Sequence, residues 1–133
     1  MFLLDTNLVS ELRKTMPHGG VLAWFLAAPE SDLFVSAVTL GDIQRGIELT
    51  RDQNLSKALE ISQWADRLTA THNILPMDAH TFRAWARLMH HQNDALLEDA
   101  MIAATAQVHQ LTVVTRNTHD FAAFKVPSHN PFE

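Results

Sequence analysis

The chain has 133 residues, of which 47% are hydrophobic and 19% are charged, and its formal net charge is −5. This length suits one compact domain with a buried core, and the composition excludes an intrinsically disordered chain. The absence of cysteine excludes disulfides, thiolate metal sites and cysteine nucleophiles, so any metal must be bound through oxygen or imidazole groups.

The first half of the chain predicts two strands and three helices. An apolar strand at residues 2–4 ends at Asp5, and a helix with Leu8, Val9 and Leu12 on one face follows. Gly19-Gly20 are expected to break the chain before a helix at 21–28 that stops at Pro29. A strand at 33–35 then leads to a helix that we expect Thr39 to cap.

The second half continues the alternation of helices and strands. A long helix is predicted at about 55–70, a strand at 73–75, and a helix capped by Asp78. A polar loop at 90–94 precedes an alanine-rich helix at 97–109, and residues 111–115 form a β-branched strand. Asn117 caps a short helix, and Val126 is expected to start an edge strand. This order predicts one α/β domain over residues 1–133 with a mainly parallel sheet of four to five strands between helices.

Nothing at the amino terminus resembles a secretory leader, because Met1 runs into Phe2-Leu3-Leu4 without a preceding basic segment. The longest apolar runs are also far shorter than a membrane span requires. We therefore expect a cytoplasmic protein that does not enter a membrane.

Four aspartates are predicted to lie at the same edge of the sheet. Asp5 ends the first strand, Asp42 lies in the first turn after the second strand, Asp99 starts the alanine-rich helix, and Asp120 follows the 111–115 strand. Ligands bind outside the carboxyl ends of parallel strands. Crowded carboxylates raise one another's pKa, and a divalent cation such as Mg²⁺ relieves this conflict with the oxygen ligands it prefers.

These four aspartates also account for most of the net negative charge of the chain. Of 15 acidic residues, 11 remain when they are set aside, against 10 lysines and arginines. The negative charge therefore does not exclude a phosphate-containing substrate, because bound cations would neutralise the cluster.

A purely structural interpretation is open for three of the four. Thr39-x-x-Asp42 and Asn117-x-x-Asp120 resemble capping boxes, and Asp99 near a helix start is favoured by the helix dipole. Asp5 ends a buried strand with no capping role to account for it, so its burial calls for a partner.

Four segments in order resemble the motifs of PIN-domain ribonuclease toxins of the VapC type, and together they span nearly the whole chain. They are Met1-Phe2-Leu3-Leu4-Asp5-Thr6-Asn7, the segment from Ser36 to Gly46, the segment from Asp99 to Ala106, and the segment from Thr115 to Phe121. The closing Asn130-Pro131-Phe132 also recurs in this branch of the family.

The resemblance implies a three-layer PIN-domain sandwich and a metal-dependent endoribonuclease. It further implies that Asp5, Asp99 and Asp120 bind Mg²⁺ or Mn²⁺ and that three residues support them through hydrogen bonds: Thr6, Thr115 and Asn117. The implied partners are an RNA substrate, a cognate antitoxin and a second copy of the chain.

The chain departs from the family pattern at Asp42, where glutamate is usual. Because aspartate is one methylene shorter, we expect Asp42 to belong to the catalytic metal site but to reach the cation through a water molecule. Glu98 could compensate, although neighbours on a helix point in different directions.

Other functions fit the sequence less well. The eight histidines contain no H-E-x-x-H zinc motif, and His119 beside Asp120 is more simply a solvated residue than a general base. A phosphoacceptor receiver domain would need an acidic pair after the first strand, where this chain has Asp5-Thr6. A PIN-like fold weakened at Asp42, acting mainly by binding an antitoxin, stays open as an alternative.

The helices carry more large apolar residues than a small core requires, including Trp24, Phe25, Leu26 and Trp64. Together with the family resemblance, this surplus predicts a homodimer.

Overall fold

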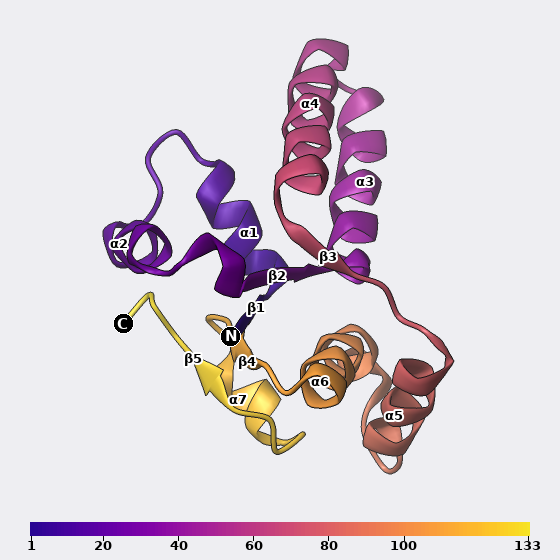
Figure 1. Ribbon diagram of the computed structural model, residues 1–133. Helices are drawn as coiled ribbons and strands as arrows, with labels where there is room; N and C mark the ends of the chain where they lie inside the picture. Colours follow the sequence, from indigo (N-terminus) through magenta and orange to yellow (C-terminus); the bar gives the residue numbers. More distant parts are fainter.

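The computed structural model describes all residues from 1 to 133 and shows a parallel sheet between two layers of helices (Figure 1). The sheet has the order β3-β2-β1-β4-β5, and every neighbouring pair of strands is parallel. This confirms the predicted α/β class and gives the sheet five strands. The strands are β1 (Phe2–Leu4), β2 (Leu33–Ser36), β3 (Asn73–Leu75), β4 (Thr112–Val114) and β5 (Ser128–His129).

Seven α-helices and two short 3-10 helices connect the strands. The α-helices are α1 (Thr6–Arg13), α2 (Gly19–Ala27), α3 (Ala37–Arg51), α4 (Leu55–Thr71), α5 (Ala79–Met89), α6 (Leu97–His109) and α7 (Thr118–Ala122). The 3-10 helices are η1 (Glu30–Asp32) and η2 (Asp94–Leu96). No helix is long and apolar enough to cross a membrane.

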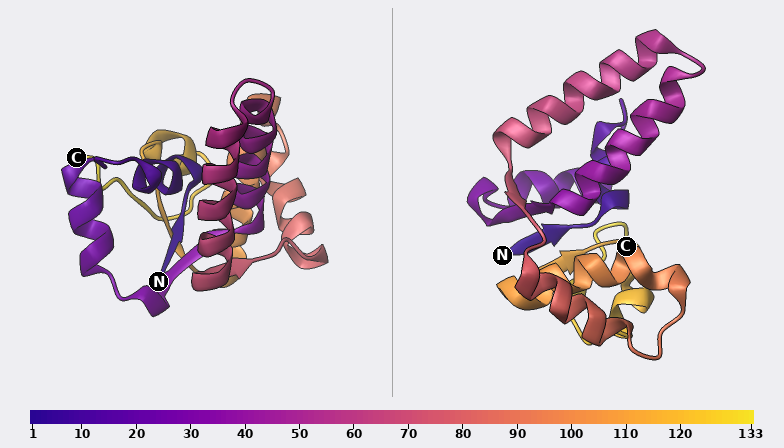
Figure 2. Two further views of the ribbon diagram at one scale, coloured as in Figure 1. Left: turned by 90° about the horizontal axis from the view of Figure 1, so that it is seen from above. Right: turned by 90° about the vertical axis from the view of Figure 1, so that its right-hand side faces the viewer.

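Each face of the sheet has its own hydrophobic core. The strands alternate, so that Leu4 and Val35 point to one face while Leu3 and Val113 point to the other. The first face packs against α1, α2, α3 and α4, and the second packs against α5, α6 and α7. Helices α3 and α4 form an antiparallel hairpin that projects beyond the sheet, as two further views show (Figure 2).

The predicted break at Gly19-Gly20 is wrong, because α2 begins at Gly19. His18 caps this helix: its Nδ1 accepts hydrogen bonds from the N–H groups of Gly20 and Val21. A Cβ on Gly20 would lie 2.6 Å from the carbonyl oxygen of Pro131. Glycine is therefore used at position 20 for a close approach to the carboxyl-terminal segment.

Two predicted caps also differ from the structure. Helix α3 begins at Ala37 and is capped by Ser36, which accepts from the N–H of Val38, so Thr39 lies inside the helix. Asn117 precedes α7 but makes no side-chain capping bond. The predicted edge strand begins at Ser128 rather than at Val126.

Candidate functional site

The predicted acidic residues gather where β1, β2 and β4 end. A polar pocket of about 290 Å³ is lined by Asp5, Asp42 and Asp99 together with Thr6, Asn7, Glu98 and Asn117. Asp120 does not line this pocket, but its charge acts on both Asp5 and Asp99. The parallel register places the strand ends side by side, because Leu4 pairs with Val35 and with Val114.

Asp5 is the most buried of the four carboxylates, with 4% of its surface exposed. Three donors fix its orientation: the Thr115 hydroxyl at 2.7 Å, the Thr6 N–H at 2.8 Å and the Asn7 amide at 3.2 Å. Asp5 is also the N-cap residue of α1, so the expectation that it has no capping role is wrong. Capping satisfies only one of its oxygens, and the other faces Asn7 and Thr115.

The pKa values of three carboxyl groups are raised, mainly because burial disfavours the charged form. Burial raises the pKa of Asp5, and the charges of Asp42 and Asp120 add to the effect, against the hydrogen bonds from Thr115 and Thr6. Partial burial likewise raises the pKa of Asp42. For Asp99, burial, the charges of Asp5 and Asp120, and a hydrogen bond with Asp120 raise the pKa to about 6.

Threonine hydroxyls hold two of the acidic side chains, Asp42 and Asp5, in place. The Thr6 hydroxyl lies 2.9 Å from the Thr39 hydroxyl and donates to Asp42 Oδ2 over 3.3 Å. Thr115 Oγ1 accepts the N–H of Asn117 over 2.9 Å while it donates to Asp5. The Thr39 hydroxyl thus contacts the Thr6 hydroxyl and does not cap α3, as the sequence had suggested that it would.

The atoms in the pocket that could bind a metal are carboxylate, hydroxyl and amide oxygens, which suit a hard divalent cation. Asn7 Oδ1 is the one buried side-chain polar atom without a hydrogen-bond partner in the structure. A buried acceptor without a donor is costly, and a cation would satisfy it. However, no three histidine, aspartate or glutamate side chains are close enough together to hold one ion as they stand. A cation bound here would therefore be held by one or two carboxylates and would keep several of its water molecules, as Mg²⁺ usually does.

The loop that carries Thr115 and Asn117 is held by the end of the chain. Asn130 donates to the carbonyl oxygen of Arg116 over 3.4 Å, and the Arg116 guanidinium lies 3.9 Å from the centre of the Phe132 ring. Arg116 also approaches the buried Glu11 at 3.9 Å. The closing Asn130-Pro131-Phe132 motif therefore packs against the loop beside the acidic pocket.

Sequence reasoning gave no role to Asn7, and it set Glu98 aside because neighbours on a helix point in different directions. Asn7 was visible as part of the opening motif but had no assigned role, and its unsatisfied oxygen appears only in three dimensions. Glu98 lines the same pocket as its neighbour Asp99. Its position at the start of α6, where the backbone turns from η2 into the helix, lets both side chains reach the pocket.

Comparisons with known proteins give a consistent result. The family model described as the PIN domain matches residues 2–126. The toxin FitB of Neisseria gonorrhoeae is 33% identical over 138 residues, with 99% of each chain covered. The VapC ribonuclease Y4jK of Sinorhizobium fredii is 33% identical over 144 residues, covering 100% of this chain and 99% of the relative. Among solved structures, a toxin–antitoxin complex from Klebsiella pneumoniae superimposes with a TM-score of 0.75 at 26% identity, covering 100% and 99% of the two chains.

Proposed function

This chain belongs to the PIN-domain family, and on that premise we propose that it is a metal-dependent endoribonuclease toxin that is inhibited by a cognate antitoxin. The observation that carries the proposal is the cluster of aspartates around one pocket at the carboxyl ends of β1, β2 and β4. The relatives named as a toxin and a ribonuclease match over nearly their full lengths, which supports the same activity for this chain.

We propose that Asp5, Asp99 and Asp120 hold Mg²⁺ or Mn²⁺, with Asp42 and the amide oxygen of Asn7 completing the site. A bound divalent cation supplies Lewis acidity and screens the negative charge of a phosphodiester. Without a cation this pocket would repel RNA, because its charged side chains are all carboxylates. Thr115, Thr6 and Asn7 orient Asp5, and Thr6 orients Asp42. Fixed carboxylates lose little freedom when the cation and the phosphate arrive.

A weaker alternative is a PIN fold that acts mainly by binding an antitoxin. The wide spacing of the acidic side chains and the short Asp42 favour it. Metal-dependent turnover of RNA separates the two functions: cleavage that requires Mn²⁺ and is lost in Asp5→Asn supports the nuclease, and the absence of any cleavage by the free protein supports the binding module.

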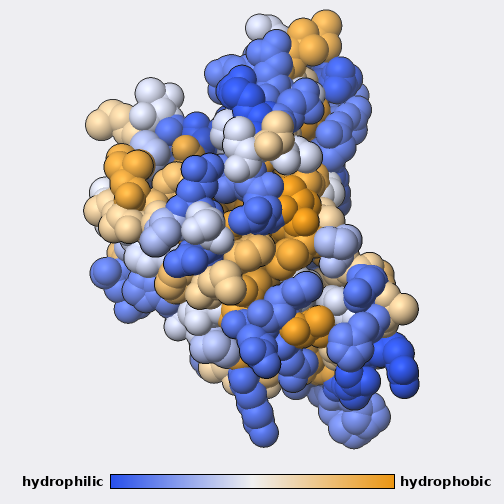
Figure 3. Space-filling model, viewed as in Figure 1, coloured by the Kyte–Doolittle hydropathy of each residue, from blue (hydrophilic) through white to orange (hydrophobic).

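We further propose two protein contacts. An antitoxin segment would cover the acidic pocket and place a basic side chain in it, since a cation of the partner can replace the metal electrostatically. A second copy of the chain would cover apolar side chains of α2, where Leu26 is 72% exposed. Hydrophobic atoms are seen on the surface near α2 in the space-filling view (Figure 3).

A further inference from the structure

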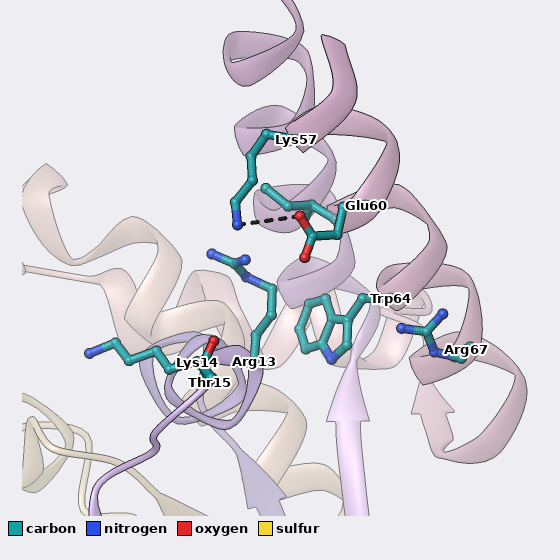
Figure 4. A pocket seen from close by; sticks show the side chains of 8 residues that line it. Arg13, Lys14, Thr15, Lys57, Glu60, Trp64 and Arg67 are labelled. Atoms are coloured by element: carbon teal, nitrogen blue, oxygen red, sulfur yellow. Dashed lines mark ion pairs between the residues drawn. The ribbon is translucent and has the colours of Figure 1, made fainter. Parts of the chain in front are cut away.

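A basic pocket lies between the end of α1 and the stretch of α4 from Lys57 to Arg67 (Figure 4). It has a volume of about 310 Å³ and is lined by Arg13, Lys14, Thr15, Lys57, Glu60, Ile61, Trp64 and Arg67. Four of the ten basic residues of an acidic protein are therefore gathered at one place. Such a concentration of positive charge attracts anions.

The positive charge of this pocket is only partly neutralised. Lys57 pairs with Glu60 at 3.5 Å, and Lys14 pairs with the buried Glu11 at 3.0 Å. Arg13 and Arg67 form no ion pair. In Figure 4 the side chains of Arg13 and Lys57 reach toward each other from α1 and α4, with Glu60 as the nearby carboxylate. An anion with several oxygens could bind Arg13 and Lys57 together.

A third pocket, lined by both polar and apolar side chains, lies between the basic pocket and the acidic pocket, and we refer to the row of three pockets as the groove. An intermediate pocket of about 210 Å³ shares Arg13 and Trp64 with the basic pocket, and it shares Thr6 and Asp42 with the acidic one. On α1, Thr6, Ser10 and Arg13 follow helical spacing along one face, and 1.5 Å per residue places Arg13 about 10 Å from Thr6 along the helix axis.

Helix α3 forms the opposite wall of this groove. Gly46 lines it without a side chain, and a Cβ built there would meet nothing within 4 Å. Thr50 lies one turn further on and also lines the groove. Gly46 therefore leaves free space at this wall, while Leu8, Ile47 and Ala58 fill the core deeper between the same three helices.

We propose that this groove binds the RNA strand on one side of the cleaved bond, with Arg13 and Arg67 contacting its phosphates. The inference rests on the proposed nuclease function. A polyanion such as RNA fits this groove, because a divalent cation can join one of its phosphates to the acidic end while other phosphates meet the basic end directly. An acidic peptide would be repelled from the acidic end. The exposed hydroxyl of Ser10, which makes no hydrogen bond within the protein, suits a sugar–phosphate backbone, which is commonly contacted by such side chains.

The test compares two double variants that remove equal charge. Arg13→Ala/Arg67→Ala alters the groove, and Arg83→Ala/Arg87→Ala removes two exposed arginines of α5 on the opposite face of the sheet. Binding of a labelled single-stranded oligouridylate is measured in Mn²⁺ over a series of KCl concentrations, with Asp5→Asn present in every protein compared so that the RNA is not cleaved. The groove variant should lose at least about tenfold in affinity, and its salt slope should become shallower by about 1.4, since each of the two lost phosphate contacts on a single strand contributes about 0.7. The α5 variant should behave as wild type.

Cleavage in Mn²⁺ supplies a second readout, in which the groove variant should raise KM with a smaller effect on kcat. Gly46→Phe should have the same effect by obstruction, while Gly46→Ala, which adds only a Cβ in open space, should not. Equal behaviour of the two arginine variants would overturn the groove even if wild type cleaves RNA. Loss of antitoxin binding with unchanged RNA binding would also overturn it. If wild type binds the oligouridylate through Arg13 and Arg67 but never cleaves RNA, the groove stands and the proposed nuclease function fails.

Discussion

The hydroxyl of Thr115 donates a 2.7 Å hydrogen bond to Oδ2 of Asp5, although 110 positions separate the two residues in the chain. The bond joins the ends of β4 and β1 and is buried. Because Thr115 also accepts the N–H of Asn117, it ties the loop after β4 to the acidic pocket.

Replacing Thr115 by valine keeps the shape of the side chain and removes both of these bonds. We expect Thr115→Val to lower stability by about 1–3 kcal/mol, because a buried carboxylate loses a donor. Metal affinity should fall by about 10–100-fold, as when a group that orients a ligand is lost. Urea unfolding and Mn²⁺ titration measure these effects. Thr105→Val is the matched control, because Thr105 is equally buried but donates only within α6 to Met101. Equal metal affinity in the two variants would contradict the role of Thr115.

The four acids could be found from the sequence because each position depends on local order: a strand ends, and an acid follows or starts the next helix. The strand at Asn73–Leu75 and the helix at Leu97–His109 were predicted with their observed bounds. The start of α2 was missed because Gly20 meets Pro131, more than a hundred residues away in sequence. The basic groove could not be predicted either, because it depends on how α4 packs over α1.

The metal-free protein should become more stable as the pH falls toward the ordinary pKa of Asp99. Burial and the charges of Asp5 and Asp120 raise the pKa of this carboxyl in the folded state to about 6, above its ordinary value of 3.8. The folded state therefore binds the proton more tightly than the unfolded state. The loss of stability caused by the ionised Asp99 disappears as the pH falls from about 6 to about 4.

Asp99→Asn removes this titration and should raise the apo protein's stability at pH 7 on the order of 1 kcal/mol, because solvent screens a half-buried group. Thermal melts from pH 7.5 to 4.5 in EDTA measure the effect, with Asp94→Asn on η2 as the control. An Asp99→Asn variant that is less stable than wild type at pH 7, with Asp94→Asn unchanged, would show that burial and repulsion do not destabilise the ionised Asp99.

Position 42 tests the departure from the family pattern. Asp42 is held by the Thr6 hydroxyl at 3.3 Å and is the shorter of the two acidic side chains possible there. Asp42→Asn should lower cleavage by about 10–100-fold, less than Asp5→Asn does, because Asp42 orients a cation-bound water instead of contacting the cation directly. Asp42→Glu should retain or increase cleavage, measured as rate against Mn²⁺ concentration. An inactive Asp42→Glu would mean that the shorter side chain is required.

The homodimer predicted from the apolar surplus can be tested at α2. Leu26 is 72% exposed, so Leu26→Glu should leave the monomer fold intact while placing a charge in the proposed interface. Sedimentation should show a dimer for wild type at micromolar concentration and a shift toward monomer for Leu26→Glu. Leu49→Glu, on the 61% exposed Leu49 near the end of α3, should not cause this shift. A wild-type protein that sediments as a monomer would disprove the dimer.

The central claim is that this chain cleaves RNA at its acidic pocket with a divalent cation. The most direct measurement is cleavage of RNA by the purified protein without its antitoxin, in Mn²⁺ and in EDTA, for wild type and for Asp5→Asn. The account predicts cleavage by wild type in Mn²⁺, none in EDTA, and a loss of at least about a hundredfold in Asp5→Asn, while the melting curve of the apo variant stays level or rises. Undiminished cleavage in EDTA, or full activity of a folded Asp5→Asn variant, would contradict it.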